Sequence, residues 1–136
     1  MGLTSAQLQC LVDAVAPFER VRVAVLHGSA AEEGPFRDVD LALLLGRDSL
    51  TAFERYRLED AIAAAVEDAL RIPCDVHIVD EVRPAFRYNV TRGRPVLVRD
   101  EELWANFKER TWNEYLDVQW LHDAYLRELA DAHAAD

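Results

Sequence analysis

Two aspartates that alternate along a short segment are the first residues whose spacing could support chemistry. Asp38 and Asp40 stand at the start of an almost wholly apolar run, 39–45, which is too short for a typical helix and is expected to be a strand buried on both faces. Side chains two positions apart in a strand leave the same face, so the two carboxylates could hold one divalent cation and, through it, phosphate oxygens. An isolated Asp-x-Asp is more often a solvated pair at the mouth of a strand, so the motif needs support.

A tight turn and a third aspartate provide that support. Gly28 and Ser29 follow an alternating apolar segment, 21–26, and a residue without a β-carbon lets backbone N–H groups approach a phosphate while the hydroxyl adds a donor. Asp75 opens a further expected strand, 75–79. Each feature alone is also typical of an ordinary turn. If the two aspartate-bearing strands are neighbours, three carboxylates converge beside the turn, and this conjunction predicts a nucleotide site.

The surrounding elements predict an α/β (α+β) fold, with a small mixed β-sheet flanked by helices. Capping boxes at 4–7 and 51–54 predict helices that end before two prolines, and the segment 82–91 is weakly helical. Residues 93–99 predict a turn and an edge strand, since Pro95 cannot donate a ladder hydrogen bond. We expect residues 1–100 to form the core and residues 101–136 to form a helical extension.

The extension carries apolar residues on more than one side. A seam at helical spacing is formed by Trp104, Phe107, Thr111, Tyr115, Val118, His122, Tyr125 and Leu129. Trp112, Leu116 and Trp120 lie off that seam. We expect the second side to meet a partner subunit, with a homo-oligomer as another option; the alternative is a bend near 117–119 that folds the last piece back onto the core.

Composition narrows the class of protein. The 136 residues carry a formal net charge of −10, which disfavours direct binding to a nucleic-acid backbone. The N-terminus lacks the pattern of a signal peptide and no apolar run would span a membrane, so a soluble cytoplasmic protein is expected. Cys10 and Cys74 are expected to be buried thiols, and the histidines show no zinc-site spacing.

The ordered set Gly28-Ser29, Asp38-Val39-Asp40-Leu41 and Asp75-Val76 resembles the DNA polymerase beta-like nucleotidyltransferase superfamily, which is marked by Gly-Ser, a spacer, Asp-x-Asp and a later strand aspartate. The resemblance covers about residues 21–79. The chain's size, its helix and strand order and the segment 114–118 look most like the minimal nucleotidyltransferase (MNT) antitoxins, which are encoded beside HEPN ribonuclease toxins.

This resemblance implies an enzyme that transfers AMP from ATP to a tyrosine hydroxyl of its HEPN toxin and thereby silences the ribonuclease. It implies a two-ion Mg²⁺ site with Asp38, Asp40 and Asp75 as metal residues, in which Asp75 also helps to activate the attacking hydroxyl. Gly28 and Ser29 would hold the triphosphate.

Two alternatives stay open. An antitoxin that acts by binding alone is favoured by the spacer 30–37, which is about two residues shorter than is usual, and by Glu32 and Glu33, which stand where most members carry Arg and then Gly. A small-molecule nucleotidyltransferase of the aminoglycoside-modifying type is the other alternative, although such relatives usually carry a further substrate domain.

Overall fold

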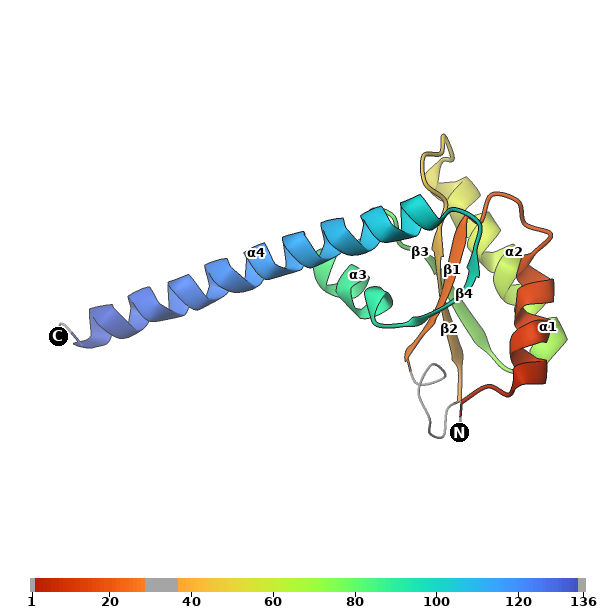
Figure 1. The fold of residues 1–136 in the computed structure, drawn as a ribbon, viewed down its shortest axis with the longest axis horizontal. Helices are drawn as coiled ribbons and strands as arrows, with labels where there is room; N and C mark the ends of the chain where they lie inside the picture. Colours follow the sequence, from red (N-terminus) through yellow and green to blue (C-terminus); the bar gives the residue numbers. More distant parts are fainter. Residues whose placement is uncertain (1, 29–36, 135–136) are drawn as a thin grey trace.

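The structure is a computed structural model that describes residues 2–28 and 37–134 (Figure 1). Its elements, in chain order, are α1 (Ser5–Val15), β1 (Val23–His27), β2 (Val39–Leu44), α2 (Ala52–Leu70), β3 (Cys74–Ile78), α3 (Pro84–Thr91), β4 (Arg94–Val98) and α4 (Glu101–Ala134). The sheet order is β3-β2-β1-β4, with β1 antiparallel to β2 and β4, and β2 parallel to β3. The expected mixed sheet, flanking helices and long C-terminal helix are confirmed.

Helices cover both faces of the sheet. Helices α1 and α2 pack on one face, while α3 and the first turns of α4 pack on the other (Figure 1). Strand β1 shows the alternation that this requires, because Ala24 and Leu26 join the core with α1 and α2, whereas Val23 and Val25 join Val90 of α3. Strand β2 is buried on both faces, as its apolar sequence predicts.

Local signals fix where the first two long helices begin. The Thr4 and Thr51 hydroxyls accept hydrogen bonds from the backbone N–H groups of Gln7 and Glu54, and those two side chains accept bonds from the threonine N–H groups in return. These reciprocal bonds satisfy donors that a helix terminus otherwise leaves free. Both predicted capping boxes are therefore confirmed.

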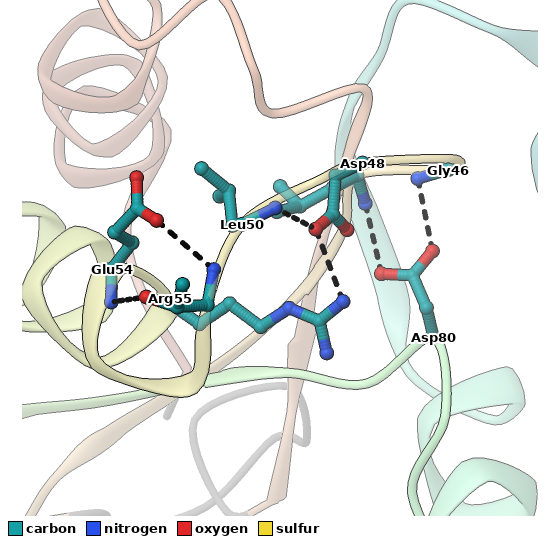
Figure 2. Close-up of polar contacts among 8 residues, drawn as sticks. Gly46, Asp48, Leu50, Glu54, Arg55 and Asp80 are labelled. Carbon is teal, nitrogen blue, oxygen red and sulfur yellow. Dashed lines mark hydrogen bonds and ion pairs between the residues drawn. The ribbon is translucent and has the colours of Figure 1, made fainter.

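The connection from β2 to α2 is held by two aspartates. The backbone N–H groups of Leu45 and Gly46 donate to the two carboxylate oxygens of Asp80, at 3.0 and 2.9 Å (Figure 2). Asp48 accepts from the Leu50 backbone N–H at 2.9 Å and from the Arg55 guanidinium at 3.0 Å. Burial raises the pKa of the Asp80 carboxyl, and these two backbone bonds oppose the rise. Asp80 thus fixes the end of β2 that lies away from Asp40.

Replacing Asp80 should lower stability without touching the candidate site. Asp80→Ala leaves two backbone donors without their acceptor, so we expect the free energy of unfolding to fall by about 3 kcal/mol. Asp80→Asn keeps one acceptor oxygen and should lose about half as much. Urea unfolding at pH 7, followed by circular dichroism, measures both changes, and equal stability of Asp80→Ala and the parent chain would contradict this role.

Helix α4 runs without a break from Glu101 to Ala134, about 50 Å, so the alternative of a bend near 117–119 is not found. Trp104 and Phe107 are buried against the sheet, and Tyr115 stacks on Tyr88 of α3 with ring centroids 4.0 Å apart. The C-terminal half then extends away from the other elements (Figure 1). Within the described part of the chain, no helix is both long and apolar enough to cross a lipid bilayer.

The two cysteines differ in exposure. Cys74 is buried, as expected, but the expectation for Cys10 is wrong, because this side chain is exposed. Cys10 directly precedes the buried Leu11 on α1, and one helical step turns a side chain by about 100° away from its neighbour. Its residue type favoured burial, but its helical position decides its exposure.

This difference predicts selective thiol chemistry. Burial, reinforced by the Glu67, Asp75 and Asp40 carboxylates, raises the pKa of the Cys74 thiol to about 12, so little thiolate forms near neutral pH. Iodoacetamide at pH 8 should therefore alkylate Cys10 in the folded protein and both cysteines after unfolding in urea. Peptide mass spectrometry checks the result, and rapid alkylation of Cys74 in the folded protein would contradict it.

Candidate functional site

Three polar residues form a row across the neighbouring strands β1, β2 and β3, at the end of the sheet where β1 finishes and β2 and β3 begin. The register pairs His27, the last residue of β1, with Asp40 of β2, and pairs Asp40 with Asp75 of β3. Directly paired residues on neighbouring strands project from the same face, with Cβ atoms about 5 Å apart. The sheet therefore brings two of the three predicted carboxylates side by side, on the face that α3 covers.

Gly28 lies against the middle of this row. Its backbone has φ +72°, and a β-carbon built there would stand 2.4 Å from Asp40 Oδ2. Both observations require glycine, because other residues rarely adopt this φ and any side chain would displace the carboxylate. The predicted turn and the predicted aspartate are thus in direct contact.

The other two predicted residues are less closely defined. Asp38 is exposed, just before β2 and two positions from Asp40, so it lies at the same end of the sheet. Ser29 falls outside the described residues, as do Glu32 and Glu33. Within residues 2–28 and 37–134, no three Asp, Glu, His or Cys side chains are already grouped closely enough to hold a metal ion. Roles of these residues in binding a metal remain predictions.

Two histidines flank the carboxylates. His77 Nε2 lies 2.9 Å from Asp75 Oδ2, so it can donate a hydrogen bond that orients this carboxylate. His27 is more enclosed: its Nε2 is buried without a hydrogen-bond partner among the described atoms. Burial lowers the pKa of His27, and although the Asp40 and Asp75 carboxylates oppose this effect, the neutral imidazole is favoured. A neutral ring can accept or donate a proton in a hydrogen bond to a ligand.

Phe86 of α3 links the two histidines. Its ring meets those of His27 and His77 edge to face, with centroid separations of 5.7 and 5.9 Å. Sequence reasoning assigned no part in the site to His27 or Phe86. The alternation of His77 with Asp75 was visible in the sequence, but the contact with Phe86 depends on how α3 packs against the sheet.

Pockets of different charge lie on the two sides of this row. One, of about 390 Å³, lies beyond Gly28, and its lining includes Arg92 and Arg94. The other, of about 380 Å³, lies between α2 and β3, and its lining includes three acidic residues of α2, Glu59, Asp60 and Glu67, as well as Asp75. An anion would fit on the side of the row that carries the arginines, and a second, uncharged group would fit on the acidic side.

Comparisons with known proteins identify the family of this chain. The family model described as "Polymerase beta, Nucleotidyltransferase" matches residues 10–102, which is more than half of the chain and includes Gly28, Asp38, Asp40 and Asp75. A search of curated proteins finds no significant match.

Several solved structures share the fold at low sequence identity. A chain of the "toxin-antitoxin with AMP-PNP" is 17% identical, with a TM-score of 0.70, and the match covers 90% of this chain and 97% of that one. A chain of the "tri-AMPylated Shewanella oneidensis HEPN toxin in complex with MNT antitoxin" is 16% identical, with a TM-score of 0.69 and coverage of 93% and 98%. The "toxin-antitoxin MntA-HepT" has a chain with 16% identity, a TM-score of 0.67 and the same coverage.

Proposed function

The chain belongs to the polymerase beta nucleotidyltransferase family, and from this premise we propose that it is an MNT-type antitoxin. It transfers AMP from ATP to a tyrosine hydroxyl of a cognate HEPN ribonuclease toxin and so neutralises the toxin. The three solved structures described above come from toxin–antitoxin complexes, one with AMP-PNP and one with a tri-AMPylated toxin, and they support this choice within the family.

The observation that carries the proposal is the contact of Gly28 with Asp40, next to Asp75 in the register of the sheet. Two carboxylates on one face repel each other, and an apolar strand such as β2 does not need them for folding. Their position beside a glycine turn suits a ligand that combines cations with phosphates.

The residues present fit Mg²⁺ in their chemistry. Magnesium prefers oxygen ligands and usually binds through one or two carboxylates together with substrate phosphates and water. Asp38 and Asp40 would hold the ions with Asp75, and the pairing of Asp40 with Asp75 in the sheet places two of these carboxylates side by side. When bound, Mg²⁺ would neutralise phosphate charge and stabilise the entering and leaving oxygens.

Residues of the chain have separate roles in the transfer. The tyrosine oxygen forms a bond to the α-phosphorus of ATP, the bond from that phosphorus to the bridging oxygen breaks, and pyrophosphate leaves. Asp75 accepts the proton of the hydroxyl, and His77 holds the carboxylate in position through the 2.9 Å contact. Gly28 keeps the turn close to Asp40, with Ser29 as a further donor to the triphosphate.

The toxin would dock on the C-terminal half of α4. We propose that residues 1–100 form the nucleotidyltransferase core and that 101–136 form an extension whose apolar side chains contact the toxin. Leu116, Trp120 and Tyr125 are exposed there, which supports a surface that another protein covers.

The test uses the chain, its co-encoded neighbour, magnesium and ATP labelled at the α-phosphate. Transfer of label to the neighbour, located by mass spectrometry on a tyrosine, together with loss of its ribonuclease activity, supports the proposal. Label that appears on neither protein, although the ribonuclease is still inhibited, would support the alternative of an antitoxin that acts by binding alone.

A further inference from the structure

The transfer step described above uses neither of the two arginines that line the pocket beyond Gly28. This pocket lies between the end of β1, helix α3 and the start of β4, and its volume of about 390 Å³ suits part of a nucleotide. Since the sheet order is β3-β2-β1-β4, the pocket lies on the side of Asp40 away from Asp75. A ligand that extends from the carboxylates across Gly28 would enter it.

Close packing fixes two arginines at this pocket. Gly93 lies so near β1 that an added β-carbon would stand 2.6 Å from the Leu26 carbonyl oxygen. Arg92 and Arg94 flank Gly93. Arg94 pairs with Leu26, two positions before Gly28, so its side chain leaves β4 on the face that α1 covers, at the edge of the sheet. Both arginines line the pocket, and Arg94 also borders a hollow next to α1. Arg92 is the C-cap of α3 and Arg94 is the first residue of β4, so neither backbone position depends on a free loop.

The charge of this pocket opposes that of the whole chain. The chain carries a formal net charge of −10, whereas the described lining of the pocket contains two arginines and no carboxylate. No ion pair between described residues uses either guanidinium. Asn89, which also lines the pocket, adds an amide donor. Cationic groups gathered beside a glycine turn in an acidic protein suit a compact polyanion.

We propose that Arg92 and Arg94 bind the β- and γ-phosphates of the nucleoside triphosphate. This inference rests on the proposed function and assigns its triphosphate to a defined side of the site. Guanidinium groups form charge-assisted bonds to phosphate oxygens, and they can stabilise the charge that develops on departing pyrophosphate. The acceptor hydroxyl then approaches from the opposite side, next to Asp75.

Isothermal titration calorimetry, with magnesium present, tests the assignment with four ligands: ATP, inorganic tripolyphosphate, AMP and adenosine. Each of Arg92→Gln and Arg94→Gln should raise the Kd for ATP and for tripolyphosphate about tenfold, and the double variant should raise it about 50-fold or more. Binding of AMP and adenosine should change less than about twofold, because neither carries the outer phosphates.

Arg57→Gln is the matched control. It removes the same charge from α2, where the guanidinium lies over the exposed Phe53 ring, and it should leave all four titrations unchanged. Thermal unfolding confirms that each variant is folded. Equal affinity of the double variant and the parent chain for tripolyphosphate overturns the assignment, as does an equal loss of affinity for adenosine, or a parent chain that binds neither ATP nor tripolyphosphate.

These titrations separate the inference from the proposed function. If ATP binds in an arginine-dependent way but no label reaches the neighbouring protein, the transfer activity fails and the phosphate assignment stands. If label is transferred and the double variant binds ATP as tightly as the parent chain, the transfer activity stands and the phosphate assignment fails.

Discussion

Asp40→Asn should lower the rate of AMP transfer by about a thousandfold or more while leaving the fold intact. Asp40 stands in the middle of the row, paired with His27 on one side and with Asp75 on the other, and its Oδ2 faces the Gly28 turn. Asparagine keeps the shape of the side chain but removes the charge that would attract a cation. Label transfer from ATP, measured as an initial rate with the partner in excess, gives the result.

Asp75→Asn and Asp68→Asn show whether this effect belongs to the site. Asp75→Asn should lose about 100-fold in rate but keep its affinity for ATP, because we assign Asp75 mainly to the acceptor proton. Asp68→Asn removes one charge from an exposed position on α2 and should change neither quantity. Transfer by Asp40→Asn at the parent rate would show that this row of carboxylates is not the catalytic site.

The expected elements follow from local chemistry. The capping boxes at Thr4 and Thr51 fixed two helix starts because their hydrogen bonds involve residues only three positions apart. Pro95 marked an edge strand because proline lacks an N–H to donate to a ladder. Helix α4 contains neither glycine nor proline, and its unbroken course agrees with that composition.

The sequence predicted that the carboxylates converge only if the two aspartate-bearing strands are neighbours. The sequence indicated that Asp40 and Asp75 begin strands, but the parallel register that sets them side by side depends on how α2 packs across the sheet. The positions of Phe86 and Arg92 were not predictable in this way, since both approach Gly28 from residues about 60 positions later in the chain. No local pattern encodes such a contact, and an alignment of co-varying positions would be the signal that could find it.

The outer half of α4 exposes a row of large apolar side chains, which folded proteins normally cover. The seam that is buried at Trp104 and Phe107 continues beyond the body of the protein through the exposed Val118 and Tyr125. Leu121 is also 61% exposed. Helices hold their apolar faces against another surface in folded proteins, and none of the described elements covers the outer half of α4 (Figure 1). The partner that we propose would supply it.

The acidic rim of this half of α4 favours a basic partner over a second copy. From residue 112 to residue 134 the helix carries five acidic side chains, Glu114, Asp117, Asp123, Glu128 and Asp131, and one arginine, Arg127. A second copy brings the same excess of negative charge, and like charges around an interface oppose association. A toxin surface with an apolar centre and a basic rim would suit it better.

We therefore expect Leu121→Ala combined with Tyr125→Ala to weaken binding of the toxin about 1,000-fold, because buried anchors of this size often account for about 2 kcal/mol each. Both side chains are exposed in the chain alone, at 61% and 59%, so their loss should change its unfolding temperature little. Phe53→Ala is the control, since this α2 residue is 67% exposed and lies away from α4. Binding is measured by calorimetry with catalytically inactive Asp40→Asn as the parent chain, which keeps AMP transfer from altering the toxin. An unchanged affinity of the double variant would show that the toxin docks elsewhere, and a dimer of the chain alone that dissociates in the double variant would assign this surface to a second copy.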